Sequence, residues 1–80
     1  FNPSTNIQFT IPQPGNVKID IYNINGELVS SLTSKDYGIG THSVTWNGKD
    51  NSGSSVSSGI YLYRMTSNNF VQSNRMLLLK

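Results

Sequence analysis

Side chains capable of acid–base or metal chemistry are few in this 80-residue chain. His42 is the only histidine, and the carboxylates are Asp20, Glu27, Asp36 and Asp50. A catalytic triad or a zinc site needs its histidine near a nucleophile, a carboxylate or a second ligand, and the sequence supplies none at a recognisable spacing. The carboxylates form no glycosidase-like pair, and no serine lies in a Gly-x-Ser-x-Gly elbow. We therefore predict a structural histidine and a chain that is not an enzyme.

Residues 50–53, Asp-Asn-Ser-Gly, come close to the pattern of a calcium loop, in which oxygen ligands alternate before a glycine. The spacing of Asn47, Lys49 and Asn51 breaks that pattern, and no bidentate glutamate follows. The residue types instead indicate a turn in which Asn47 and Asp50 accept hydrogen bonds from nearby backbone N–H groups. The chain has no cysteine, so thiolate metal sites and disulfides are excluded. We expect no cofactor and no metal.

The aromatic side chains could form a stacking platform for sugars, made of Tyr22, Tyr37, Trp46, Tyr61 and Tyr63. The competing interpretation is structural. In a β-sandwich, a Tyr-x-Tyr motif after a glycine is more often a core-and-corner device, with one hydroxyl bonded back to the backbone. The alternate positions of this strand are equally apolar, so periodicity alone does not decide which face is buried. We favour Tyr61, Tyr63 and Met65 pointing inward.

Length and composition limit the other classes of function. A chain this short forms one domain at most and buries only about 60% of its unfolded surface, which leaves little room for a deep catalytic cavity. The net charge of +2 comes from scattered groups, and no basic cluster would follow a nucleic-acid backbone. No apolar run approaches the roughly 18 residues of a membrane span. Because the sequence begins without methionine, we expect residues 1–80 to be a single domain excised from a larger secreted protein.

The first half of the chain predicts three strands. Apolar and polar side chains alternate twice with a period of two, at Ile7, Phe9 and Ile11 and then at Val17, Ile19 and Ile21. Asn25-Gly26 follows and favours a hairpin with a type I′ turn, since both residues tolerate positive φ. The return strand is expected over residues 27–32. Residues 34–40 are predicted to be a connector in which Ile39 is buried.

The second half predicts three more strands and no helix. His42, Val44 and Trp46 share one face of the fourth strand, and Val56 anchors the following loop to the core. The fifth strand spans residues 60–67, and the sixth runs from residue 70 to the end. Short strands at roughly 8–12-residue spacing are typical of a β-sandwich.

The chain ends in an apolar run between two cations: Arg75, Met76, Leu77, Leu78, Leu79 and Lys80. A chain terminus is usually polar and frayed, so this run needs an explanation. A last strand docked in the sheet is sufficient. A strand near an edge also suits recognition by strand addition or by capture of a terminal carboxylate.

Several separated motifs, taken together and in order, resemble one known family. The opening is Phe1-Asn2-Pro3-Ser4-Thr5 with Ile7-Gln8-Phe9, and the hairpin is Gly15-Asn16-Val17-Lys18-Ile19 with Ile21-Tyr22-Asn23-Ile24-Asn25-Gly26. The most specific signature is His42-Ser43-Val44-Thr45-Trp46-Asn47-Gly48-Lys49-Asp50, the loop glycine Gly53, and Ser58-Gly59-Ile60-Tyr61-Leu62-Tyr63-Arg64. The last motif is the terminal run from Arg75 to Lys80.

These motifs are similar to those of the C-terminal sorting domain of proteins exported by the type IX secretion system, whose fold is shared with the Ig-like module of the flagellar hook-capping protein. The resemblance covers essentially the whole chain. It implies an all-β, immunoglobulin-like β-sandwich of about seven short antiparallel strands. Asn47 stands where the family often has aspartate, and Ser54-Ser55 replaces more varied residues. Neither departure alters the expected fold.

The resemblance implies a non-catalytic sorting signal that directs a cargo protein, attached on its N-terminal side, across the outer membrane. The implied partners are the outer-membrane translocon and a sortase-like protease. The implied location is secreted or at the surface of a Gram-negative bacterium, reached through the periplasm. The motif residues with structural roles would be Trp46, Asn47, Gly48, Asp50, Gly53, Gly59, Tyr61, Tyr63 and Arg64, and sorting recognition would fall on the terminal run. The alternatives are an accessory carbohydrate-binding module and an Ig-like spacer of a polysaccharide-degrading enzyme.

Overall fold

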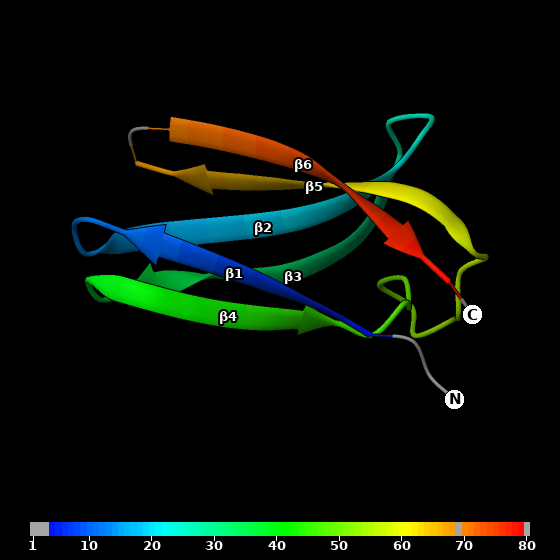
Figure 1. The fold of residues 1–80 in the computed structure, drawn as a ribbon, viewed down its shortest axis with the longest axis horizontal. Coiled ribbons are helices and arrows are strands. Elements are labelled where there is room, and N and C mark those ends of the chain that lie inside the picture. Colours follow the sequence, from blue (N-terminus) through cyan, green and yellow to red (C-terminus); the bar gives the residue numbers. More distant parts are fainter. Residues whose placement is uncertain (1–3, 69, 80) are drawn as a thin grey trace.

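The computed structural model describes residues 4–68 and 70–79, which form β-strands, turns and loops without a helix (Figure 1). The six strands of this part are β1 (Thr5–Ile11), β2 (Gly15–Asn23), β3 (Leu28–Tyr37), β4 (Gly40–Trp46), β5 (Gly59–Ser67) and β6 (Phe70–Leu78). The all-β prediction is confirmed, with six strands in place of about seven. Within the described residues there is no helix that could span a membrane.

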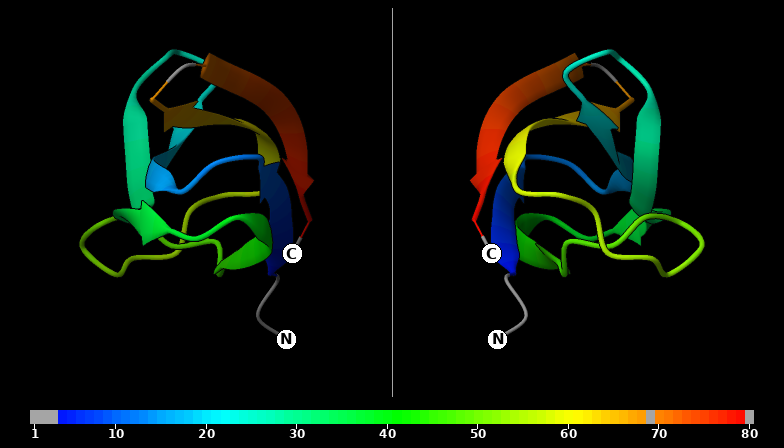
Figure 2. Two further views of the ribbon diagram at one scale, coloured as in Figure 1. Left: turned by 90° about the vertical axis from the view of Figure 1, so that its left-hand side faces the viewer. Right: turned by 90° about the vertical axis from the view of Figure 1, so that its right-hand side faces the viewer.

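The strands form two antiparallel sheets that face each other as a sandwich (Figure 2). One sheet contains only β1 and β4, and the other has the order β3-β2-β5-β6. The central strands β2 and β5 are bonded on both sides, whereas β3 and β6 are the edges of the larger sheet. Only the edge strands of a sheet can pair with a strand of another molecule, and in the larger sheet these are β3 and β6.

The core lies between the two sheets and is built from the alternation seen in the sequence. Its buried apolar side chains are Ile7, Phe9, Ile11, Val17, Ile19, Ile21, Trp46, Tyr61, Met65 and Leu78. Burying an aliphatic side chain of this size stabilises the fold by about 1.5–3 kcal/mol. β2 supplies the three isoleucine and valine side chains that have no exposed surface at all, which makes it the central strand of the core.

The hairpin between β2 and β3 forms as predicted, but its turn is of another type. Gly26 N donates to Asn23 O, and Asn23 N donates to Glu27 O, both at 3.0 Å. Gly26 has a φ of 83°, whereas Asn25 does not have a positive φ. This is a type I turn followed by a glycine bulge, so the type I′ prediction is wrong. Asn23 causes the difference, because its Oδ1 accepts from the N–H groups of Asn25 and Glu27 and holds the alternative turn.

The connector after the third strand is shorter than predicted, because β3 continues to Tyr37. Ile39 lies at the tip of the turn into β4 and is 68% exposed, so its predicted burial is wrong. The anchoring role belongs to Tyr37. Its ring packs edge to face on Phe9 at 5.2 Å, and its hydroxyl shares a 2.7 Å hydrogen bond with Thr33 Oγ1. With Tyr37 holding this end of the sandwich, the tip of the turn faces solvent.

Candidate functional site

The loop after β4 is fixed at both ends by two buried rings. Trp46 is 1% exposed, and its Nε1–H donates to the carbonyl of Lys49 at 3.0 Å. The hydroxyl of buried Tyr61 donates to the carbonyl of Ser57 at 2.7 Å, which confirms the predicted bond from a tyrosine back to the backbone. The two rings meet edge to face with centroids 5.0 Å apart. This contact ties the start and the end of the loop to the same part of the core.

Asp50 organises the middle of this loop. Its Oδ1 accepts from Ser52 Oγ at 2.7 Å and from the backbone N–H groups of Ser52 and Ser54 at 3.0 Å. These donors stabilise the charged form and hold the pKa of Asp50 below its ordinary value, the Ser52 hydroxyl contributing most. Asn47 Oδ1 accepts from the N–H of Lys49 at 3.2 Å. The prediction that Asn47 and Asp50 lock a turn is confirmed.

The signature glycines shape the same loop. Gly53 has a φ of 88°, a left-handed conformation that favours glycine, and its N–H donates to Asp50 O at 3.0 Å. Gly48 O accepts from the N–H of Val56, whose side chain packs on the core as predicted. Gly59 begins β5. Across residues 4–68 and 70–79, no three His, Cys, Asp or Glu side chains come together as a metal-binding group.

The loop also covers part of the β3 edge, which the sequence did not indicate. Asn51 N donates to Val29 O at 3.0 Å, and Asn51 Oδ1 accepts from Ser31 N at 2.9 Å. One residue thereby bonds two outward-facing backbone groups of β3, as a residue of a neighbouring strand would. No local pattern signals a contact between residues 20 positions apart.

His42 has a structural role, as predicted. Its Nε2 lies 2.8 Å from the carbonyl of Gly38, so this ring nitrogen carries the hydrogen and donates it. The ring sits beside Tyr37 and Phe9, with centroids 4.9 and 5.6 Å away. These contacts fix the turn between β3 and β4.

The rings named as a sugar platform are mostly engaged in the fold. Tyr61 and Met65 are buried, and half-buried Tyr63 packs against the core, so the predicted inward face is confirmed. The Tyr63 hydroxyl accepts a 3.0 Å hydrogen bond from Asn74 Nδ2 on β6. Trp46 is covered on all sides. Trp46 and Tyr61 therefore offer no ring face to a sugar.

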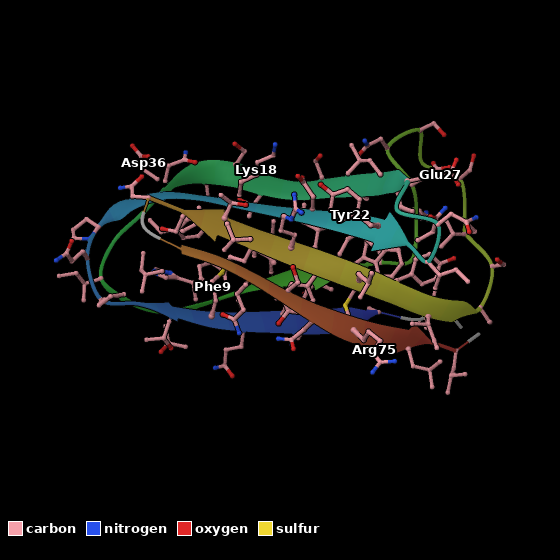
Figure 3. The ribbon with its side chains drawn as sticks, turned by 90° about the horizontal axis from the view of Figure 1, so that it is seen from above. Phe9, Lys18, Tyr22, Glu27, Asp36 and Arg75 are labelled. Atoms are coloured by element: carbon pink, nitrogen blue, oxygen red, sulfur yellow. The ribbon has the colours of Figure 1, made fainter. Side chains whose placement is uncertain are left out.

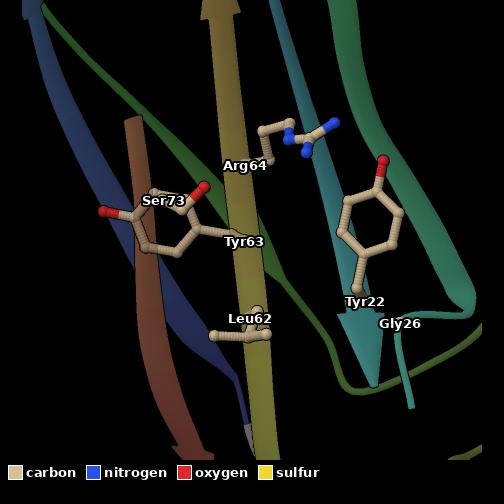
Figure 4. A pocket seen from close by; sticks show the side chains of 6 residues that line it. All are labelled: Tyr22, Gly26, Leu62, Tyr63, Arg64 and Ser73. Atoms are coloured by element: carbon tan, nitrogen blue, oxygen red, sulfur yellow. The ribbon is translucent and has the colours of Figure 1, made fainter. Parts of the chain in front are cut away.

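The outer face of the larger sheet, on which Figure 3 labels Tyr22, carries a cation above an aromatic ring. Arg64 on β5 lies over the ring of Tyr22 on β2, 5.8 Å from its centroid. They line a pocket of about 340 Å³ together with Gly26, Leu62, Tyr63 and Ser73, and Figure 4 shows the guanidinium directed toward Tyr22. The sequence identified Arg64 as a motif residue but gave no sign of this pocket.

A buried carboxylate lies on the same face. Asp20 is directly opposite Arg64 in the ladder between β2 and β5, and its side chain is 8% exposed. Lys18 Nζ lies 3.4 Å from Asp20 Oδ2, whereas Asp20 Oδ1 has no hydrogen-bond partner. The ion pair with Lys18 offsets part of the desolvation of this carboxylate.

The predicted recognition run does not form a single patch. Leu78 is buried, at 2% exposed, and Met76 packs on the core, whereas Leu77 and Leu79 are 60% and 65% exposed. Arg75 is also exposed. β6 therefore anchors the run with alternate side chains and presents the others. Lys80 and residues 1–3 of the opening motif lie outside the described residues.

The FlgD Ig-like domain family matches residues 2–70. The chain belongs to this family. Its fold is similar to that of FlgD from P. aeruginosa, with a TM-score of 0.75 and 21% sequence identity over 94% of this chain. The chain spans 59% of the length of that FlgD structure, and no curated protein sequence matches it.

The family match covers most of the Ig-like domain. It covers the first five strands with the Trp46 loop and ends at residue 70, where β6 begins. At 21% identity, the likeness to FlgD concerns the fold alone. The predicted resemblance is thus confirmed at the level of an Ig-like module related to flagellar hook-capping protein.

Proposed function

We propose that this Ig-like domain is a non-catalytic C-terminal sorting signal of the type IX secretion system. The observation that carries the proposal is the alternation along the end of β6. Leu78 fixes the strand in the core, while Leu77 on this edge strand and Leu79 just after it remain exposed. The ordered motifs between His42 and Arg64 add support through the family resemblance, and Trp46 and Asp50 within them fix the loop that leads to β5.

Exposed leucines on an edge strand are unfavourable unless another molecule covers them. Neighbouring unpaired backbone groups add to the hazard of unwanted pairing. A receptor that binds such a strand gains main-chain hydrogen bonds and apolar contacts together. Recognition by an export receptor would give these side chains a purpose that a spacer between domains does not require.

In the proposed role, the domain makes and breaks no bonds. It is carried at the C-terminal side of a cargo protein, reaches the periplasm with it, and is bound there by the outer-membrane translocon. A sortase-like protease then separates the cargo, which is released or attached to the cell surface of a Gram-negative bacterium. The frame matters because it holds the recognised strand in one conformation before binding, which lowers the entropic cost of association.

The test is export of a reporter fused to the domain in a type IX-competent bacterium. Deleting the terminal run would also remove buried Leu78, so we choose the double variant Leu77→Asp and Leu79→Asp, which changes only exposed side chains. We expect the reporter to accumulate in the periplasm. The matched control is Ile39→Asp, a similarly exposed apolar position in the turn between β3 and β4. Normal surface delivery of the double variant, with its fold intact by circular dichroism, would contradict the proposal.

A further inference from the structure

The two edges of the larger sheet are protected unequally. On the β3 edge, Asn51 bonds Val29 and Ser31, as described above. The pairing of β3 with β2 is also shifted at two points, between Ile19 and Asp20 and between Ile21 and Tyr22. Loop cover and irregular register are both devices that prevent another strand from pairing with an edge. The β3 edge is therefore protected at its start, around Val29 and Ser31, and distorted by the shifted register.

The β6 edge has none of these devices. It is nine residues long, contains no proline, and pairs with β5 in an unbroken register from Gly59↔Leu78 to Ser67↔Phe70. The long-range backbone hydrogen bond from the loop after β4 goes to β3 at Val29 and not to β6. β6 bends toward β1 in the other sheet, but no ladder joins the two strands (Figure 2). No ladder pairs its outward N–H and C=O groups within the described residues.

The side chains along β6 indicate what kind of partner this would be. Val71, Ser73, Arg75 and Leu77 share the outer face, because the register places them opposite outer-face residues of β5. Val71 and Leu77 are 61% and 60% exposed. Ile60, Arg75, Met76 and Leu77 line a hollow of about 280 Å³. An added strand would place its own alternate side chains beside this apolar and cationic row.

The charge of the row is not balanced within the described residues. Arg75 and Arg64 form no ion pair there, since the one ion pair of this part joins Lys18 to Asp20. Glu27 is bonded to Asn23 in the hairpin, and Asp50 is bonded within its loop. A second copy of this chain would bring the same cations to the contact. An acidic side chain beside Arg75 gives the favourable cross-strand pair.

We propose that the β6 edge binds an extended segment of a partner protein by strand addition, with an acidic side chain beside Arg75 and apolar side chains beside Val71 and Leu77. The biological partner rests on the proposed function, in which it belongs to the export machinery. The binding chemistry does not depend on that function. The inference adds that recognition is made through the main chain of β6 and through charge, rather than by the two exposed leucines alone.

The probe is a capped synthetic peptide, Thr-Leu-Thr-Glu-Thr-Ser-Thr-Leu-Thr, titrated into the isotope-labelled chain and followed by NMR. Its alternate side chains match the row on β6 in antiparallel order. We expect amide shifts and slowed hydrogen exchange confined to β6 and its immediate neighbours. A peptide with lysine in place of glutamate should bind about 3- to 10-fold more weakly. Absence of saturable binding, or shifts that map elsewhere, would overturn the proposal.

Two further arms separate strand addition from general attraction. Two peptides are compared, one N-methylated at its odd-numbered residues and one at its even-numbered residues. One should lose binding and the other should retain it, because only one of the two sets of N–H groups faces β6. Arg75→Glu should reverse the preference to the lysine peptide, whereas Lys35→Glu, the same charge change on β3, should leave the preference unchanged. Equal binding of both methylated peptides, or no reversal with Arg75→Glu, would refute this mode.

The outcomes also distinguish this inference from the proposed function. If export fails in the Leu77 and Leu79 variant but the peptide does not bind β6, the sorting role stands and strand addition is wrong. If the peptide binds β6 as expected but export is indifferent to the variant, the docking surface stands and the sorting role is wrong. Shifts of β6 amides with protein concentration alone would identify a second copy as the occupant and overturn the acidic partner.

Discussion

At the scale of single residues, Trp46 connects the core to the signature loop. Its ring is buried against Tyr61, while its indole N–H closes the first turn of the loop at Lys49. One side chain thus contributes apolar burial and a directional bond. This dual use explains why the signature combines tryptophan with small turn-forming residues: the ring fixes the position of the loop, and Asp50 with its serine donors fixes the path.

We predict that Trp46→Ala destabilises the domain by about 3–5 kcal/mol, since the vacated volume is enclosed by packed side chains. A chain of this length has a total stability of about 4–12 kcal/mol, so the variant should be close to unfolding at moderate temperature. Chemical denaturation measures the effect. Trp46→Phe serves as the control, because it retains most of the apolar volume and should lose less. A loss below about 1 kcal/mol for the alanine variant would mean that the ring is not a core residue.

At the scale of elements, the edges of the larger sheet determine how the domain behaves. The long-range contact of Asn51 covers the start of the β3 edge, whereas β6, the other edge, has no such contact from this loop. This asymmetry fits a domain that must pair with a partner on one side without pairing with copies of itself on the other. Edge strands that are protected against unwanted pairing are usual in β-proteins.

We predict that Asn51→Ala lowers the free energy of unfolding by about 0.5–1.5 kcal/mol, the ordinary contribution of one hydrogen bond. More specifically, the Ser31 amide should exchange with solvent faster, because its acceptor is Asn51 Oδ1. Hydrogen exchange followed by NMR measures this residue by residue. Asn51→Asp retains the acceptor and is the control. Unchanged exchange at Ser31 in the alanine variant would show that the loop does not protect the β3 edge.

The elements also show what the sequence could and could not predict. Regular alternation in β1 and β2 identified strands whose one face is buried. The end of β3 escaped prediction because Ser34, Lys35 and Asp36 are all exposed, so no apolar period marks the strand there. The type I′ prediction was wrong because it considered only the Asn25-Gly26 dipeptide. The turn type is set by Asn23, which precedes the dipeptide and accepts a hydrogen bond from the N–H of Asn25. The turn-locking roles of Asn47 and Asp50 were predictable because their partners are close in sequence, whereas the contact of Asn51 with β3 was not.

At the scale of the whole molecule, two layers of strands hold one edge strand at a fixed position. The five-strand part matched by the FlgD Ig-like family supplies the frame, and β6 supplies the exposed alternation of apolar and cationic side chains. The sequence alone could identify this frame through its ordered motifs. The pocket at Arg64 and the open edge of β6 could not be predicted, because both depend on which strands become neighbours.

The most direct test of the central claim uses the intact chain as a transferable signal. A periplasmic reporter fused to residues 1–80 is expressed in a type IX-competent bacterium and in a strain without a working translocon, and the fraction of reporter at the cell surface is measured. The account predicts surface delivery in the first strain and periplasmic retention in the second. A reporter that stays in the periplasm of both strains, although the domain is folded, would contradict the claim that this domain is an export signal.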